Sequence, residues 1–472
     1  MVGGSSQLSN GVREKVEEVA EHRGRLLCYT SARMSEPLLH VLVINWNGRE
    51  HLDGCFESLL SAQYGNIRFV LVDNGSSDGS VAYVRERYGH DARVEFLELP
   101  ENLGWSGGNN AGMLRAMEAG AAYVFLLNND TRVDANVFEN TIALAESFPQ
   151  VGVVAPKMVL FGQRCVLNSV GLFCTPAGTS WDIGAGRLDG PRWNGGEAVV
   201  GACGGACLIR TEALKKTGLL PEEFVIYLDD LDLCLRIWDA GYEVRPCPDA
   251  VVEHKFSASM GEGERAKYKY FLATRNRFLV VFRNFSCLRI LQSAPWIALA
   301  EARSLGRAVL DGLWWRIGAH FRAWIYTIIR LPSLLAYRQA RKRLGLSMGR
   351  FWLMMHRGEL FCPGVELPQD GWYKSRSVEG REVRPMSATA WIDTEGGQLR
   401  VFHANCYPHL GATQVRMEVK GKTLALLSAS HMETVQVEVP TGRLMFVAER
   451  IFHAEETGAL TEYGGWISVE PG

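Results

Sequence analysis

Three aspartates crowd the start of a segment with helical periodicity. Asp229, Asp230 and Asp232 lie within four residues, and apolar residues then recur at the spacing of a helix face. The dipole at a helix N-terminus stabilises one or two such carboxylates as caps. Three of them repel one another unless a cation, a substrate proton or hydrogen-bond donors lie nearby. The sequence therefore predicts that one of the three is a working base.

A second acidic site follows a buried-strand pattern in the segment LLNNDT (126–131). Asn128 and Asp130 are separated by one residue at the predicted strand end. An acidic residue there can hold Mg²⁺ or Mn²⁺, which prefer oxygen ligands and keep phosphate oxygens and water around them. The same Asn-Asn-Asp run also makes a good turn, so both interpretations stand. His254 ends another apolar run, where a lone histidine is more often a packed core residue than a ligand.

Two further polar segments could contact a nucleotide. In VDNGSSDGS (72–80), Asp73 could accept a hydrogen bond from a base edge or a ribose, or belong to a capping turn before a helix. The pattern ENLGWSGGNNAG (101–112) is typical of a glycine-rich loop that opens a helix, where backbone N–H groups favour phosphate. It follows the third predicted strand, whereas a dinucleotide fingerprint follows the first, which argues against NAD. Cys203 and Cys207 lack a partner pair with zinc-ligand spacing.

Alternating strand and helix patterns position these clusters. The run LLHVLVINWNG (38–48) is continuously apolar until its closing Asn and Gly, as in a strand buried on both faces. Further strands are predicted at 67–80, 94–100 and 123–131, and helices at 49–63, 81–89 and 109–121. Short connections between them predict an α/β domain with a mostly parallel mixed sheet. Ligands bind at the carboxyl ends of such strands, where the polar clusters lie.

Composition changes along the chain and predicts four parts. Residues 1–38 form a polar tail, largely disordered, with a short helix over 12–26, and residues 39–286 form the α/β domain. Residues 287–350 carry eleven basic and two acidic residues, a net charge of +9, and are rich in Trp, Leu and Ile. We expect a basic amphipathic helical segment there. Residues 351–472 alternate apolar and polar positions and predict a β-rich, sandwich-like accessory domain.

The overall composition excludes several classes of protein. The 472 residues have a formal net charge of −2, which argues against a nucleic-acid partner. The 11 cysteines have no regular spacing, which argues against a disulfide framework and for a reducing compartment. Near residue 300 the longest charge-free run, 290–300, has 11 residues, whereas a spanning helix needs about 20. We therefore expect a cytoplasmic protein without a spanning helix.

Six motifs together resemble those of the family 2 glycosyltransferases. In order along residues 40 to about 285 they are VLVINWNG, LVDNGSSDGS, ENLGWSGGNNAG, LLNNDT, GACGGACLIR and LDDLDLCLR. Within that family the chain is similar to the rhamnosyltransferase-like bacterial branch, and the resemblance covers about half of its length. It implies the nucleotide-diphospho-sugar transferase (GT-A) fold and the transfer of a sugar to an acceptor hydroxyl.

The resemblance also implies roles for individual residues. Asp230 matches the general base, with Asp229 beside it on the acceptor. Asn128 and Asp130 occupy the Asp-x-Asp motif, so Asp130 is the main metal carboxylate, and His254 falls where some members place a metal ligand. Around the substrates the resemblance implies Asn45 and Asn47 beside the nucleotide, Asp73 on the base or ribose, Asn102 and Gly107 near the ribose and sugar, and Gly204 and Gly205 in a loop that closes over donor and acceptor.

The expected reaction is a single displacement. A Mg²⁺ or Mn²⁺ ion at Asp130 and His254 would neutralise the departing diphosphate, while Asp230 removes the proton of the attacking hydroxyl. Configuration inverts, and no second nucleophilic carboxylate is required. The resemblance implies a nucleotide-diphospho-sugar donor, with dTDP-rhamnose as one candidate. It also implies a glycan or lipid-linked acceptor in cell-surface polysaccharide synthesis.

The basic segment 287–350 has two interpretations. It could be an ordinary packing element with solvated arginines. It could also be a helix pair on an anionic membrane surface, with Trp296, Trp314, Trp315 and Trp324 at headgroup depth. Acceptors in this family are often lipid-linked, which favours the second interpretation and a peripheral place on the inner face of the plasma membrane.

Two other functions are alternatives to sugar transfer. A non-catalytic carbohydrate-binding or scaffold protein could use the same fold, although the retained acidic residues argue against it. A sugar-nucleotide pyrophosphorylase would need a glycine-rich loop with basic residues directly after the first strand, and NWNGREHLDG (45–54) lacks one. The β-rich domain weakly resembles accessory modules of bacterial glycosyltransferases, for which a binding role and a structural role are both open.

Overall fold

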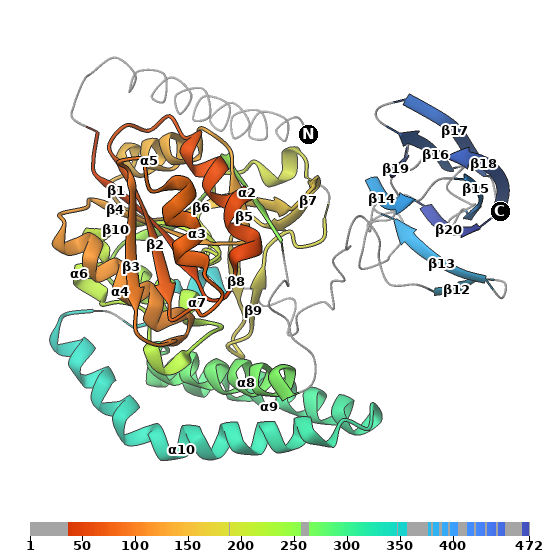
Figure 1. Cartoon of the computed structure of the whole chain (residues 1–472). Helices are drawn as coiled ribbons and strands as arrows, with labels where there is room; N and C mark the ends of the chain where they lie inside the picture. The colour runs from red at the N-terminus through yellow and green to blue at the C-terminus, as the bar shows by residue number, and fades with distance from the viewer. Residues whose placement is uncertain are drawn as a thin grey trace, which may run out of the picture.

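The structure is a computed structural model of the whole chain (Figure 1). It describes residues 36–187, 189–255, 264–346 and 348–355, together with nine strands between residues 376 and 471. The predicted helix over 12–26 and nearly all of the predicted tail 1–38 lie outside the described residues.

One mixed sheet forms the centre of the first domain. Its strand order is β3-β2-β1-β4-β10-β6-β11-β5, with β7 paired to β6. The pairs among β1, β2, β3 and β4 are parallel, as is β6 with β11, whereas β10, β5 and β7 pair antiparallel. The strands are β1 (Leu39–Asn45), β2 (Ile67–Asn74), β3 (Val94–Leu99), β4 (Tyr123–Asn128), β5 (Thr131–Val133), β6 (Val151–Leu160), β7 (Gln163–Ser169), β10 (Ala206–Arg210) and β11 (Glu243–His254).

Both faces of this sheet are covered, which explains the continuous apolar runs. In β1, Leu42 and Ile44 belong to one buried apolar cluster, and Val41 and Val43 belong to another. Side chains alternate between the two faces of a strand, so each face needs its own apolar set. The helices are α2 (Arg49–Leu60), α3 (Ser80–Tyr88), α4 (Gly104–Glu118), α5 (Val137–Ser147), α6 (Thr211–Thr217) and α7 (Asp229–Asp239). The predicted α/β class with a mixed sheet is confirmed.

The glycine-rich segment differs from the prediction of a loop. Helix α4 begins at Gly104, five residues before the predicted start, so these glycines lie inside its first turns. A Cβ at Gly108 would lie 2.5 Å from Ile44 Cδ1, and one at Gly112 would lie 2.8 Å from Leu42 Cδ1. Because these two glycines have no side chain, α4 can pack closely against the sheet.

Three long helices follow the sheet domain: α8 (Glu264–Asn284), α9 (Cys287–Leu310) and α10 (Trp314–Arg343). They run beneath the sheet domain in Figure 1, and α8 packs along α10. In the part of the chain that the structure describes, no helix is long and apolar enough to cross a membrane.

The boundary expected at residue 350 falls inside this packing. The short 3₁₀ helix η3 (Arg350–Met354) contacts α7, and Phe351, Trp352 and Met355 join the core beneath the sheet. Leu334 of α10 joins the same core. Residues 350–355 therefore pack with the α/β domain rather than with the β-rich region, because their apolar side chains complete its core.

The C-terminal strands form two antiparallel sheets, with orders β12-β13-β20-β15-β18 and β14-β19-β16-β17. Strand β17 contacts β18 and β15 of the other sheet, which agrees with the predicted sandwich-like arrangement. The strands are β12 (Arg376–Val378), β13 (Arg381–Met386), β14 (Thr389–Thr394), β15 (Gly397–Ala404), β16 (Thr413–Val419), β17 (Lys422–Ala429), β18 (Met432–Val439), β19 (Gly442–Ala448) and β20 (Gly465–Pro471).

Candidate active site

One cavity of about 590 Å³ collects most of the predicted chemistry. Asp130 and Asp230, which are 100 positions apart in the sequence, both line it. The other predicted site residues in its wall are Asn128, Gly204, Gly205, Asp229 and His254. Both acidic sites therefore face the same cavity.

Unusual backbone geometry brings the acidic pair into the cavity. Val225, Tyr227 and Leu228 have φ values of 66°, 73° and 62°, a left-handed conformation that is costly for residues with side chains. The Asn276 side-chain amide donates to the carbonyls of Phe224 (3.0 Å), Ile226 (2.9 Å) and Tyr227 (2.9 Å). Asn276, buried in α8, thus holds this turn at the start of α7.

Asp229 and Asp230 form a coupled pair. The Gly204 N–H donates to Asp230 Oδ2 at 2.9 Å, and the Leu231 N–H donates to its Oδ1 at 2.7 Å. The Ser106 hydroxyl donates to Asp229 Oδ2 at 2.5 Å. Burial raises the pKa of both carboxyls, and the Asp230 charge helps raise the pKa of Asp229 to about 7. The pair therefore holds a proton at a pH where isolated aspartates are ionised.

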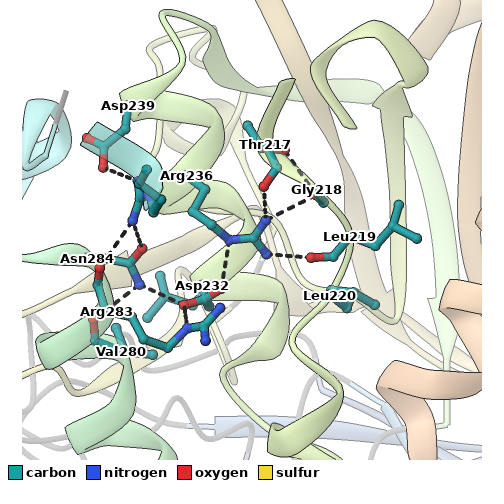
Figure 2. A network of polar contacts seen from close by, with 12 residues as sticks. Thr217, Gly218, Leu219, Leu220, Asp232, Arg236, Asp239, Val280, Arg283 and Asn284 are labelled. Carbon is teal, nitrogen blue, oxygen red and sulfur yellow. Dashed lines mark hydrogen bonds and ion pairs between the residues drawn. The ribbon is translucent and has the colours of Figure 1, made fainter. Parts of the chain in front are cut away.

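Asp232, the third aspartate, does not line this cavity. Figure 2 shows the polar contacts that it makes with the surrounding side chains. Its Oδ2 accepts from Arg236 Nε at 2.8 Å, and its Oδ1 accepts from Arg283 Nε at 2.9 Å and Asn284 Nδ2 at 2.7 Å. Burial alone would raise the pKa of Asp232, but the charges of Arg283 and Arg236 hold it well below its usual range. This carboxylate is a structural anchor that ties α7 to α8.

The second acidic site is assembled by strand pairing. At the ends of β11 and β5, His254 pairs with Thr131, so its ring lies beside Asp130. His254 Nε2 is 3.3 Å from Asp130 Oδ1, a buried oxygen that accepts no hydrogen bond from the described residues. His254 Nδ1 lies 2.6 Å from Asn168 Oδ1. An Nδ1–H donor there leaves Nε2 as the lone-pair nitrogen facing Asp130.

This pair fits a divalent cation. A carboxylate oxygen and an imidazole nitrogen are both metal ligands, and an outer hydrogen bond to the other ring nitrogen is usual for a ligating histidine. Among the described residues, no group of three or more His, Cys, Asp or Glu side chains could hold a metal. Two protein ligands leave room for diphosphate oxygens and water, the shell that Mg²⁺ prefers in phosphate sites.

Asn128 has a partner other than a cation. Its Oδ1 accepts from the Trp105 indole Nε1 at 3.1 Å, and its backbone N–H donates to the Gly205 carbonyl at 2.9 Å. A Cβ at Gly204 would overlap the Trp105 ring. The asparagine at the start of the Asp-x-Asp position thus helps hold Trp105 against the 204–205 loop.

The residues expected at the nucleotide do not line the main cavity. Asp73 lines a neighbouring hollow of about 470 Å³. Asn45 is fully buried, donates to Asp73 Oδ1 (3.2 Å) and Ser80 Oγ (2.9 Å), and accepts from Asn129 Nδ2 (2.7 Å). The Asn45 amide is therefore occupied within the protein, where it positions Asp73. A place for Asn45 beside the nucleotide stays a prediction.

The other three expected residues line neither cavity. Asn47 is exposed, with φ of 50°, and its Oδ1 accepts from the Ser77 N–H at 2.8 Å. Asn102 Oδ1 accepts from Gly104 N–H at 2.8 Å. Gly107 is buried in α4, where a Cβ would lie 2.7 Å from Leu103 Cβ, so packing accounts for this glycine.

Several cavity residues were not predicted from the sequence. Asp182, at the end of β9 (Ser180–Asp182), is half-buried, and loss of solvent around its carboxyl together with the Asp230 charge raises its pKa to about 6. β9 pairs with β8 (Leu172–Cys174) in a short hairpin. Arg277 reaches the cavity from α8. Neither residue sits in a motif, so no local signal could have found it; Trp105 lay within the glycine-rich motif.

Comparison with known proteins shows what this domain resembles. Residues 40–218 match the model of glycosyl transferase family 2. This match and the relatives described next support a glycosyltransferase that uses a nucleotide-sugar donor.

Two relatives extend the match. The chain is 26% identical over 256 residues to the low-salt glycan biosynthesis hexosyltransferase Agl10 of Haloferax volcanii. This match covers 52% of this chain and 76% of that protein. It is 26% identical over 247 residues to the N-acetylglucosaminyl-diphospho-decaprenol L-rhamnosyltransferase of Mycobacterium tuberculosis, covering 48% of this chain and 78% of that protein. Among solved structures, GalNAc-T7 with UDP, GalNAc and Mn²⁺ has a TM-score of 0.49 at 14% identity, covering 77% of this chain and 64% of that chain.

Proposed function

We propose that the chain is an inverting, divalent-cation-dependent glycosyltransferase, with Asp230 as its general base. The observation that supports this most is that Asp130, His254 and Asp230 line one cavity. A bound Mg²⁺ or Mn²⁺ would supply the positive charge that neutralises a departing nucleoside diphosphate.

The protein's own groups divide the remaining work. Asp130 Oδ1 and His254 Nε2 hold the cation, and Asn168 keeps the histidine in the required tautomer. Asp230 accepts the proton of the acceptor hydroxyl while the Gly204 N–H holds its carboxylate in place. Asp230 suits this role better than Asp229, which is more deeply buried and bonded to Ser106. One displacement without a covalent intermediate inverts the anomeric carbon.

The donor has its own proposed binding residues and a candidate sugar. Asp73, beside its hollow, is proposed to bind the base or ribose, with Asn47 and Asn102 in the adjacent turns. The name of the mycobacterial relative supports rhamnose as a candidate donor sugar, which we propose is carried by dTDP, and a lipid-linked or glycan acceptor. Gly204 and Gly205 are proposed to close over both substrates.

A donor screen tests this function directly. The full chain is incubated with dTDP-, UDP- and GDP-sugars plus Mn²⁺, and release of nucleoside diphosphate is measured. We expect turnover with one class, its loss in EDTA, and its loss in Asp130→Asn. No release with any donor would favour the alternative, a non-catalytic carbohydrate-binding or scaffold protein.

We also propose that α9 and α10 rest on an anionic membrane surface at the inner face of the plasma membrane. Both helices expose large apolar side chains: Leu288, Leu291, Leu299, Val309, Leu310, Trp314, Phe321, Ile325, Ile328, Ile329, Leu331 and Leu335. The +9 charge of 287–350 complements anionic lipids. Two of its arginines are used internally, because Arg338 and Arg341 are buried and donate to carbonyls of 282–285.

The tryptophans are divided between surface and interior. Trp314 is 65% exposed, whereas Trp324 donates its indole N–H to Glu301 at 2.7 Å. Deleting 287–350 would also remove core residues, so point variants are the better test. We expect Ile325→Asp with Ile328→Asp to abolish co-sedimentation with phosphatidylglycerol vesicles, while Leu114→Asp, an exposed leucine on α4, leaves it intact. Unchanged binding of the double variant would exclude this surface.

A further inference from the structure

The helical wall of the cavity contains a buried cation. Arg277 of α8 and Ser304 of α9 line the cavity together with Asp130 and His254 from the strand ends. Arg277 is only 7% exposed. Among the described residues that line this cavity, it is the one arginine, and no lysine accompanies it.

Three helices fix the position of this guanidinium. Arg277 Nη2 forms an ion pair with Glu301 Oε1 of α9. The other oxygen of Glu301 accepts from Trp324 Nε1 at 2.7 Å and lies 2.9 Å from His320 Nδ1, both on α10. The guanidinium also lies 4.8 Å from the centre of the Phe278 ring. Arg277 is thus held on one edge, with little freedom to turn.

The Nε edge of the same guanidinium has no acceptor. Arg277 Nε is buried and donates to none of the described residues. A buried donor without a partner costs about 1–3 kcal/mol, so such groups are rare unless a ligand or water completes them. Arginine presents N–H groups in a planar fork that matches the oxygens of a phosphate.

We propose that Arg277 binds a phosphate or diphosphate carried by the acceptor, within the cavity that the cation pair also lines. This rests on the proposed glycosyl transfer and defines its acceptor class as a phosphorylated sugar. The donor diphosphate is assigned to Asp130 and His254, so a second anion-binding group on α8 serves the other substrate. Trp181 of β9 and Ser304 line the cavity and would flank the acceptor sugar.

The test is a calorimetric titration of the full chain with glucose 1-phosphate, with inorganic phosphate, and with uncharged methyl glucoside, all in EDTA. Wild type is expected to bind the two phosphates and not the glucoside. Arg277→Gln should weaken phosphate binding at least about tenfold, and Arg277→Lys by less, because lysine keeps the charge but loses the fork. Arg87→Gln, an exposed arginine on α3, is the matched control and should bind as wild type does.

Several outcomes would overturn the subsite. They are failure of the wild type to bind either phosphate, or equal binding by Arg277→Gln. A parallel titration with UDP and Mn²⁺ gives a third such outcome: a loss in Arg277→Gln confined to UDP would place Arg277 on the donor. If Arg277→Gln unfolds because Glu301 loses its partner, the double variant with Glu301→Gln replaces it. Donor hydrolysis by the wild type against Asp130→Asn tests the transferase separately, because neither protein alters Arg277.

Discussion

The first turn of α7 has two sides that treat the same residue type in opposite ways. Toward the core, Asp232 is fully buried between Arg236 and Arg283, and its pKa lies well below the usual range. Toward the cavity, burial raises the pKa of Asp229 and Asp230. Depth of burial therefore does not decide the charge of a carboxylate here. The presence or absence of a neighbouring guanidinium does, and it separates an anchor from a reactive pair.

The largest expected effect is a loss of transfer activity on replacing Asp230, on the cavity side of α7. Asp230→Asn removes the proposed proton acceptor but keeps an oxygen for the Gly204 N–H, so we expect transfer to fall by about 10²–10⁴-fold with the fold retained. Initial rates on the donor found in the screen measure this. Asp311→Asn, at an exposed site after α9, is the control and should transfer normally. Near-normal turnover of Asp230→Asn would remove Asp230 from the base role.

On the core side, replacing Asp232 should lower the stability of the fold. Asp232→Ala leaves Arg283 and Arg236 buried without their carboxylate, which should lower the free energy of unfolding by about 3–5 kcal/mol. Urea unfolding followed by tryptophan fluorescence measures it. The matched change Asp311→Ala breaks only a surface pair with Arg307 and should cost under about 1 kcal/mol. Equal losses in the two variants would contradict the anchor.

The two sides should also differ in their pH dependence. The pKa of Asp229 is raised to about 7, so its contribution to stability is present at low pH and is lost as the pH rises through 7. Asp229→Asn removes that loss. Between pH 5 and pH 8 the free energy of unfolding of this variant should therefore rise by about 1–3 kcal/mol relative to that of the wild type. The pKa of Asp232 is lowered in the folded protein, so this residue stabilises the fold at any pH above its pKa in the unfolded chain. Asp232→Asn should therefore show no gain in the free energy of unfolding between the two pH values. Parallel urea curves at the two pH values decide this.

The smallest expected effect comes from one hydroxyl. The Ser106 hydrogen bond favours the ionised form of Asp229 and opposes the rise in its pKa. Ser106→Ala should therefore move the midpoint of the pH-dependent stability change upward by less than about one pH unit. Ser58→Ala, whose hydroxyl donates to the Cys55 carbonyl and does not line the cavity, is the control. A downward shift would mean that the hydroxyl does not stabilise the carboxylate.

Sequence patterns predicted the elements better than the contacts. The strand over 39–45 and the helix over 80–88 begin within a residue or so of their expected positions, because buried apolar runs and helical periodicity are local signals. The pattern also suggested a phosphate loop at 101–112, where α4 in fact packs closely on β1. Glycine has the same local signature in both settings. Nothing local shows, either, that the Asn45 side chain is buried and bonded to Asp73.

The sequence by itself determined that polar clusters follow buried strands, and that three aspartates open one helix. Only the tertiary structure decided which of those aspartates reach the cavity, that His254 lies beside Asp130, and that Asp182 and Arg277 join them. The reason is physical. Periodicity and turn chemistry act over a few residues, whereas pKa, ion pairing and cavity shape depend on strand register and helix packing between segments far apart in the chain.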